Sequence, residues 1–134
     1  MSVPRQTVFV VDDDASHLSS MERLLNASGY RVECFSTARE LIARLSTPAL
    51  GCIITDLKMP GMNGLEFIRA LEERNNDAQI VMVTAHASVT SAVEAMRHGA
   101  FDYIEKPFTA DQLETLVDRA FRRGKQLHPR VVPF

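Results

Sequence analysis

Extended apolar segments and helical patterns alternate from one end of the chain to the other, and this alternation constrains the fold more than any other feature. The segments with strand character cover residues 8–11, 31–35, 52–56, 80–84 and 101–105. Each is followed by apolar residues at helical spacing, as Leu18, Met21 and Leu25 follow the first segment. Strict alternation of this kind predicts an α/β fold: a doubly wound, five-stranded parallel sheet with helices on both faces.

The strand segments differ in pattern, which predicts where each lies in the sheet. The segments around Val8, Ile53 and Ile80 are apolar throughout, as strands covered by helices on both sides are. The segment at residues 31–35 alternates and carries charge, which suits an edge strand. We therefore expect the three apolar strands in the middle of the sheet and the 31–35 strand at an edge.

Two of the helices give specific expectations about caps and buried faces. Ser36 is expected to cap the helix that follows the edge strand, whose inner face includes Ala38 and Leu41. The helix at residues 89–97 is expected to bury one apolar face. That face consists of Val89, Ala92, Val93 and Met96.

The composition is that of one ordinary soluble domain and excludes several function classes. The chain has 134 residues, of which 46% are hydrophobic and 24% charged, and a net charge of −2. So small a charge draws neither nucleic acid nor an anionic membrane to the protein. No apolar run approaches the ~18 residues of a spanning helix, and residues 1–5 are too short and polar for a secretory signal. We therefore expect a cytosolic protein.

The two cysteines and the four histidines predict neither a disulfide nor a zinc site. Cys34 and Cys52 fall in strands that another strand is expected to separate, which places them ~10 Å apart and out of reach of each other. Both are interpreted as small hydrophobic residues. None of the histidines, His17 included, has the ligand spacing of a zinc site.

Polar residues follow or close four of the five strands. Residues 12–14 are three aspartates after the first strand, Asp56 closes the third, Thr84 closes the fourth, and Lys106 follows the fifth. Each alone has a plain explanation as a helix cap, a turn residue or a solvated lysine, but the combination is hard to obtain by capping alone. The carboxyl ends of parallel strands meet at one edge. Because clustered carboxylates resist ionisation unless a cation joins them, we expect a divalent metal beside one reactive aspartate.

At these strand ends the chain resembles the receiver domain of two-component response regulators, over residues 7–123. The matching segments are VVDDD at 10–14, TDLKMPGMNG at 55–64, TAH at 84–86 and GAFDYIEKPF at 99–108. The resemblance implies the flavodoxin-like strand order 2-1-3-4-5, a receiver domain at residues 5–125 and a linker or tail at 126–134. The second and third segments are most similar to receivers attached to transcriptional output domains.

The resemblance implies a role for each residue of the metal and phosphoryl site. Asp56 would be the phosphoacceptor, attacking the phosphorus of a phosphohistidine in a partner kinase. Asp13 and Asp56 would ligate Mg²⁺ directly, together with the backbone carbonyl of Lys58. Asp12 would act through a bound water. In phosphoryl transfer the protein contributes mainly by positioning the reacting groups and by neutralising charge on the phosphoryl oxygens.

The resemblance also implies residues that read and time the phosphorylation. Lys106 would pair with one phosphoryl oxygen, and Thr84 would donate its hydroxyl to another. Tyr103 would rotate inward when Thr84 moves; the alternative is a static, half-buried tyrosine. Lys58 and His86 would flank the path of an attacking water and tune the lifetime of the acyl phosphate, in a direction that the sequence does not decide.

The expected partners follow from the same resemblance. A sensor histidine kinase would supply the phosphoryl group, and phosphorylation would promote a homodimer. The dimer would use the helix at 89–97, the fifth strand and the last helix, with Thr90, Ser91, Glu94 and Ala95 exposed on that face. The chain would contact DNA only through an output domain outside this sequence, and no membrane. The peptide bond between Lys106 and Pro107 is often cis in such domains.

Three alternatives stay open at this point. Asp12, Asp14 and Ser16 resemble the start of a haloacid-dehalogenase-type phosphatase, but the acids after Lys106 all fall in the last predicted helix, where that family needs a strand end. A receiver-like scaffold that is never phosphorylated is disfavoured by the intact acid, threonine and lysine set. A stand-alone phosphorelay receiver is the third. The chain is not expected to be an enzyme, although it takes part in its own phosphoryl transfer and autodephosphorylation.

Overall fold

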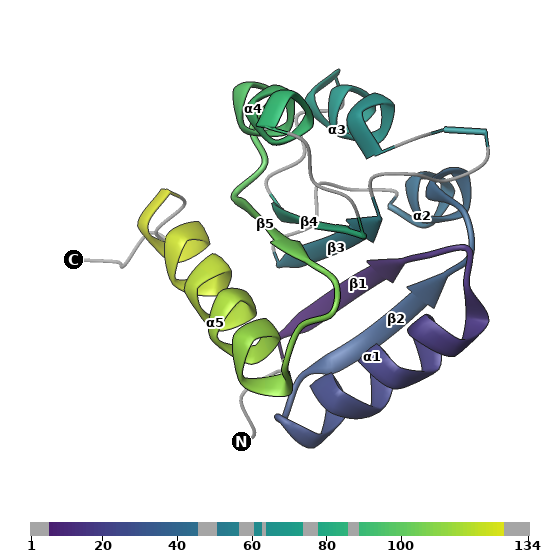
Figure 1. The fold of residues 1–134 in the computed structure, drawn as a ribbon, viewed down its shortest axis with the longest axis vertical. Coiled ribbons are helices and arrows are strands. Elements are labelled where there is room, and N and C mark those ends of the chain that lie inside the picture. Colours follow the sequence, from purple (N-terminus) through teal and green to yellow (C-terminus); the bar gives the residue numbers. More distant parts are fainter. Residues whose placement is uncertain are drawn as a thin grey trace.

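Five parallel strands form one sheet at the centre of the molecule (Figure 1). The structure is a computed structural model and describes residues 6–45, 51–56, 61–62, 64–73, 78–85 and 89–127. The strands are β1 (Thr7–Val11), β2 (Arg31–Phe35), β3 (Cys52–Asp56), β4 (Gln79–Thr84) and β5 (Asp102–Glu105). Their order in the sheet is β2-β1-β3-β4-β5, which confirms the predicted 2-1-3-4-5 topology.

Five helices cover the two faces of this sheet. They are α1 (Ala15–Ala27), α2 (Ala38–Arg44), α3 (Gly64–Glu73), α4 (Val89–Arg97) and α5 (Ala110–Leu127). Figure 1 shows α1 and α5 on one face and α2, α3 and α4 on the other, the doubly wound arrangement expected from the alternation. Helix α5 ends two residues beyond the domain boundary predicted at residue 125. No helix in the described ranges is long and apolar enough to cross a membrane.

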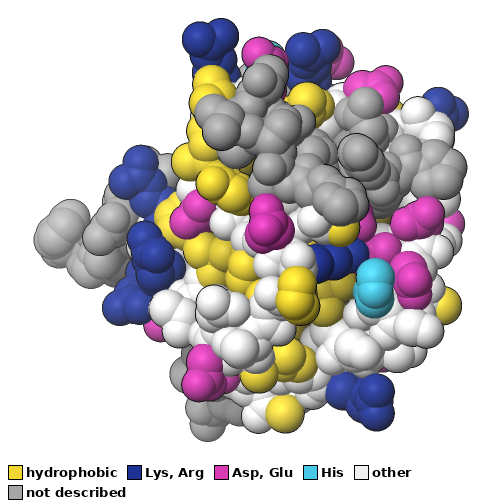
Figure 2. All heavy atoms as spheres, viewed as in Figure 1, with side chains coloured by type: hydrophobic (Ala, Val, Ile, Leu, Met, Phe, Trp, Pro, Cys, Tyr) yellow, Lys and Arg dark blue, Asp and Glu magenta, His cyan; other side chains and the backbone are white. Residues whose placement is uncertain are grey.

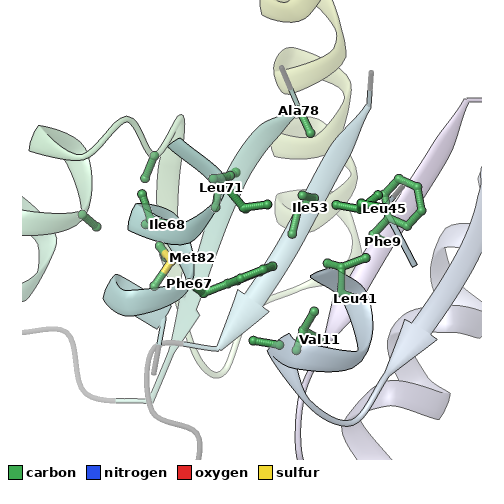
Figure 3. Packing of buried hydrophobic residues seen from close by; sticks show 14 residues of the cluster. Phe9, Val11, Leu41, Leu45, Ile53, Phe67, Ile68, Leu71, Ala78 and Met82 are labelled. Carbon is green, nitrogen blue, oxygen red and sulfur yellow. The ribbon is translucent and has the colours of Figure 1, made fainter. Parts of the chain in front are cut away.

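The alternation of side chains along each central strand divides the core into two halves. Phe9 and Val11 of β1 pack with Ile53 of β3 against α2 and α3 (Figure 3). Val8 and Val10 point to the opposite face and pack against α1 and α5. Since successive side chains of a strand point to opposite sides, a strand covered on both faces must be apolar at every position. This confirms the interpretation of the apolar runs.

Strand β2 lies at an edge of the sheet, as its charged pattern predicted. Its register pairs Cys34 with Val10 of β1, while Cys52 of β3 pairs with Val8 on the other side of β1. The two cysteines are therefore separated by a strand, and both are free thiols. Full burial raises the pKa of the Cys52 thiol to about 12, so it acts as the small hydrophobic residue expected from the sequence.

The cap of α2 is one residue away from the position predicted. Thr37, in extended conformation, is the N-cap, and its Oγ1 accepts a hydrogen bond from the backbone N–H of Glu40 at 3.2 Å. Ser36 instead donates through its hydroxyl to the Glu40 carboxylate at 2.8 Å. The reason is the spacing of a capping box, in which the residue that returns to the cap lies three positions after it. Glu40 stands in that position relative to Thr37.

The exposed face of α4 differs from the prediction. Val93 and Met96, expected to be buried, are 46% and 45% exposed, whereas Ala95, expected on the surface, is 2% exposed and packs into the core. Helix α4 packs against α3 and not only against the sheet, and the edge strand β5 is four residues long. Only a narrow face of α4 is therefore buried in the core, and the small side chain of Ala95 lies on that face.

Candidate functional site

Three side chains from distant parts of the chain meet beyond the carboxyl end of the sheet. Lys106 Nζ lies 3.1 Å from Asp56 Oδ2 and 3.4 Å from Asp12 Oδ2. The side chains of Asp12, Asp56 and Lys106 are 2%, 14% and 18% exposed, so this ion-pair group is mostly shielded from water. The convergence of acids and an ammonium predicted from the strand ends is therefore present for these three residues.

Asp12 is held in place at the end of β1 by backbone hydrogen bonds. Its own N–H donates to the carbonyl of Phe35 at 3.1 Å, which continues the pairing of β1 with β2. The N–H of Asp14 donates to Asp12 Oδ1 at 2.9 Å. With Oδ1 occupied in this way, Oδ2 is the oxygen that faces Lys106. A buried carboxylate is stable in this position because both oxygens have partners.

Asp14 has a different role from the aspartate two positions before it. It is the N-cap of α1, and its Oδ1 accepts from the backbone N–H groups of Ser16 at 2.8 Å and His17 at 3.2 Å. The hydrogen bond from His17 lowers the pKa of Asp14, with smaller contributions from Ser16 and the nearby charges. Helix capping, the plain explanation for an aspartate after a strand, therefore applies to Asp14 and not to Asp12.

Lys106 is positioned by the end of β5. Its backbone N–H donates to the carbonyl of Thr84 at 2.8 Å, and the peptide bond to Pro107 is cis, as expected. Burial by itself lowers the pKa of Lys106, but the hydrogen bond to Asp56 and the charges of Asp12 and Asp56 outweigh it and raise the pKa. The side chain is therefore a stable ammonium that reaches across the end of β4 to β3.

The remaining predicted site residues are distributed unevenly. Thr84 is buried at the end of β4, and Asp13 is exposed between Asp12 and the cap of α1. Lys58 and His86, predicted to tune the lifetime of the acyl phosphate, lie outside the described residues. Among the residues described, no three acidic, histidine or cysteine side chains lie close enough to hold a metal ion.

The donor set nevertheless fits Mg²⁺. Asp12 and Asp56 turn carboxylate oxygens toward one cation, the Lys106 ammonium, which already occupies the region between them. Mg²⁺ is commonly held by one or two carboxylates and completes its shell with water, so a pair of acids is a sufficient protein contribution. Carboxylate oxygens are the ligands that a hard cation such as Mg²⁺ prefers.

One residue of the site was missed by the sequence interpretation. His17 Nδ1 lies 3.0 Å from Lys106 Nζ and 3.5 Å from Asp12 Oδ2. His17 lacks the spacing to other zinc ligands by which a histidine in a site is most easily recognised. The available signal was its place in the first turn of α1, because helical side chains lean toward the N-terminus of their helix and thus back toward the strand end.

Comparison with known proteins gives a consistent match. The family model described as "Response regulator receiver domain" matches residues 8–118. The transcriptional regulatory protein FixJ of Bradyrhizobium diazoefficiens is 35% identical over 118 residues, which cover 88% of this chain and 58% of FixJ. The C4-dicarboxylate transport transcriptional regulatory protein DctD of Rhizobium meliloti is 39% identical over 114 residues, 85% of this chain and 25% of DctD. The chain thus spans about half or less of these relatives.

Solved structures agree with the sequence relatives. Full-length FixJ from B. japonicum superposes with a TM-score of 0.86 at 32% identity, covering 95% of this chain and 63% of that one. The beryllofluoride-activated receiver domain dimer of NtrC4 superposes with a TM-score of 0.82, also at 32% identity, covering 88% and 98% of the two chains. With its 2-1-3-4-5 sheet and the family match over most of its length, the chain belongs to the receiver domains of two-component response regulators.

Proposed function

We propose that Asp56 accepts a phosphoryl group from the phosphohistidine of a sensor histidine kinase, and that this transfer switches an output, which in keeping with the relatives is transcription. The observation that carries the proposal is the Lys106 ammonium, 3.1 Å from the Asp56 carboxylate at the end of the central strand β3. Membership of the receiver family excludes the dehalogenase-type phosphatase considered from the sequence. A receiver transduces a signal and is not in general an enzyme.

In the proposed reaction a carboxylate oxygen of Asp56 bonds to phosphorus while the bond from phosphorus to the imidazole nitrogen of the kinase breaks. Charge spreads over the three equatorial phosphoryl oxygens, so the protein accelerates the transfer mainly by placing positive charge and hydrogen-bond donors around them. Lys106 supplies the positive charge, and its position next to Asp56 suits a phosphoryl oxygen. Thr84, at the end of the adjacent strand β4, supplies a hydroxyl for another oxygen.

Magnesium is proposed as the cofactor of this site. Asp13 and Asp56 would ligate it directly, with the backbone carbonyl of Lys58, and Asp12 would act through water. When bound, Mg²⁺ would neutralise negative charge on the phosphoryl oxygens. Asp12 is held through Oδ1 by the Asp14 N–H, and its other oxygen faces Lys106.

Three further expectations stay predictions. Lys58 and His86 would set the rate at which the acyl phosphate hydrolyses, and the autodephosphorylation expected of the chain would depend on them. The cytosolic location expected from the sequence is the second. The output is the third, because the chain covers 25% to 58% of the curated relatives described above, and a stand-alone phosphorelay receiver would use the same site.

The proposed function is tested with acetyl phosphate, a small phosphoryl donor that needs no kinase. In the presence of Mg²⁺ the intact mass of the protein should rise by one phosphoryl group, and with the metal removed by EDTA the mass should stay unchanged. A protein that gains no mass under either condition would support the alternative of an unphosphorylated scaffold. A gain of two or more groups would mean that the acid cluster does not select one aspartate.

We propose that phosphorylation acts on a surface formed by α4, β5 and α5. Val93, Met96 and Tyr103 are the large hydrophobic side chains exposed among the described residues, and all three lie on α4 or β5. Tyr103 is 42% exposed and pairs in register with Met82, two residues before Thr84 on β4. Movement of Thr84 toward a phosphoryl group would open space for Tyr103 and bias a two-state element. The NtrC4 receiver, solved as a beryllofluoride-activated dimer, supports a dimer as the outcome.

Light scattering with and without beryllofluoride and Mg²⁺ tests the dimer proposal. The protein should double its mass in the presence of the phosphoryl mimic, and Met96→Asp should keep it monomeric because a charge would replace exposed apolar surface. Ser20→Asp, on the exposed side of α1, is the matched control and should dimerise as the unchanged protein does. Monomers in both conditions, with identical amide exchange over residues 84–105, would exclude this surface as the switch.

A further inference from the structure

The Lys106 ammonium lies near three polar atoms, one of which belongs to neither carboxylate. Its Nζ lies 3.1 Å from Asp56 Oδ2, 3.4 Å from Asp12 Oδ2 and 3.0 Å from His17 Nδ1. An ammonium has three N–H donors and no acceptor, so its donors match these three atoms in number, and the imidazole nitrogen is the nearest of them. Figure 2 shows a histidine beside a Lys or Arg side chain, with acidic side chains next to them, on the viewed face.

The geometry decides which way the contact with the imidazole runs. Because an ammonium can only donate, Nδ1 must present its lone pair to Lys106, and the ring hydrogen then lies on Nε2. A charged imidazole would instead donate to Asp12 Oδ2 at 3.5 Å or Asp14 Oδ2 at 3.9 Å while facing the ammonium at 3.0 Å. Both carboxylate distances are longer than the contact with Lys106. The distances therefore favour His17 as an acceptor.

We propose that His17 is a positioning residue for phosphoryl transfer, which holds the Lys106 ammonium in place while Asp56 reacts. The proposal rests on the proposed function of Asp56. During the proposed reaction Asp56 bonds to the phosphoryl group and Asp12 interacts with the metal. His17 has neither role. It can keep one N–H of Lys106 throughout the reaction, so that the other two stay directed toward Asp12 and Asp56.

The physical need for such a holder comes from the lysine side chain itself. Its four-carbon stem has many rotamers, and fixing it in one of them is opposed by side-chain entropy. Once a carboxylate oxygen of Asp56 is bonded to phosphorus, its pull on the ammonium weakens. Without His17 the ammonium would then be held by fewer partners at the moment when its position matters most. The plain alternative is a solvated helix residue whose approach to Lys106 has no function.

The position can be changed without unfolding the protein. The His17 side chain is about half exposed, and its backbone N–H is held by Asp14 whatever side chain it carries. His17→Leu removes the acceptor while keeping bulk. His17→Asn restores one, because the amide oxygen of asparagine lies close to the place of Nδ1. Ser20→Ala, also exposed on α1, is the matched control.

The contact is read first, without phosphate, by NMR of the lysine side-chain nitrogens in ¹⁵N-labelled protein. The Lys106 ammonium should give a resonance protected from exchange in the unchanged protein, in His17→Asn and in Ser20→Ala. It should lose that protection in His17→Leu. Equal protection in His17→Leu and the unchanged protein would show that the imidazole does not hold the ammonium, and would overturn the proposal at its first step.

The role in transfer is read from the rate of phosphorylation by acetyl phosphate at saturating Mg²⁺. Loss of one hydrogen bond of ordinary strength, as expected at a half-exposed imidazole, should slow His17→Leu about three- to tenfold, with the Mg²⁺ concentration at half-saturation unchanged. His17→Asn should recover most of the rate. In a Lys106→Met background His17→Leu should have no further effect, because His17 acts through the lysine.

The outcomes separate this proposal from the one on which it rests. An unchanged rate in His17→Leu, a failure of His17→Asn to recover it, or an equal loss in the Lys106→Met background would each overturn the positioning role. If the unchanged protein takes up no phosphoryl group, the proposed function fails and the role in transfer fails with it. The NMR measurement would still report, in that case, whether the contact between His17 and Lys106 exists.

Discussion

Replacing Asp56 with asparagine is expected to abolish uptake of the phosphoryl group, with a loss of at least about 1,000-fold in rate. The amide of asparagine has no charge and is a far weaker nucleophile than a carboxylate. The fold should remain, because the carboxylate is partly exposed and asparagine has almost the same shape. Intact mass after incubation with acetyl phosphate and Mg²⁺ measures the effect, and circular dichroism checks the fold.

The control must show that the loss is specific to this carboxylate. Asp118→Asn removes an exposed acid on α5, whose partner is Arg122 at 2.8 Å, and should be phosphorylated like the unchanged protein. Borohydride, which reduces an aspartyl phosphate to homoserine, then locates the modified residue by peptide mapping. A phosphoryl group that persists in Asp56→Asn, or homoserine at position 12 or 13 of the unchanged protein, would assign the wrong aspartate.

Lys106→Met is expected to have the second largest effect, and to act on both activity and stability. Phosphorylation by acetyl phosphate should slow by about 10- to 100-fold, because the positive charge that faces the phosphoryl oxygens is lost. The free energy of unfolding at pH 7 should fall by about 1–3 kcal/mol, because Asp12 and Asp56 lose the cation between them. The loss is smaller than for a fully buried pair, since solvent still reaches Lys106 and Asp56.

The stability effect should depend on pH in a defined direction. The pKa of Lys106 is raised in the folded state above 10.5, its ordinary value, although burial alone would lower it. Its contribution is therefore fully present below pH 10.5 and is lost as the pH rises through the folded-state pKa. The difference between Lys106→Met and the unchanged protein in urea denaturation should be constant from neutral pH to about pH 9 and shrink above pH 10.5.

Arg122→Met is the matched control for this stability effect. The Arg122–Asp118 contact, at 2.8 Å, is shorter than either contact of Lys106 with an aspartate, but both of its side chains are largely exposed. An exposed ion pair contributes about 0–1 kcal/mol, so its removal should hardly change the free energy of unfolding. Similar decreases in the free energy of unfolding in Lys106→Met and Arg122→Met would contradict the prediction. They would show that shielding from water does not strengthen the ion pairs of Lys106 with Asp12 and Asp56.

Much of the site could be predicted from the sequence because parallel strands impose a simple geometry. Each strand ends at the same edge of the sheet, so residues that follow separate strands must come near one another. Asp12, Asp56 and Lys106 meet for this reason, although 94 positions separate the first from the last. Local patterns also placed the strands in part, since the charged alternation of β2 marks an edge and the uniform apolar runs mark the centre, whereas the full order 2-1-3-4-5 came from the resemblance to receiver domains.

Tertiary packing alone decided which face of α4 is buried. The apolar residues of this helix could be assigned to more than one face, and the sequence interpretation chose the one with the larger side chains. In the structure the space beside α3 accepts the small Ala95 and leaves Val93 and Met96 outside. Periodicity reports that a helix has an apolar side, but the shape of the neighbouring elements determines which side chains fit.

The distinct roles of the three aspartates and the part played by His17 also depend on the tertiary structure. Adjacent acids look alike in a sequence, and only the start of α1 separates the cap Asp14 from the buried Asp12. No sequence spacing identifies His17 as a site residue. It lies in the site because α1 begins close to the end of β5, where Lys106 is located. The alternating pattern of the sequence by itself determined the α/β fold class and brought the acids and the lysine to one edge of the sheet. Contacts between side chains 89 positions apart were decided only by the packing of elements in three dimensions.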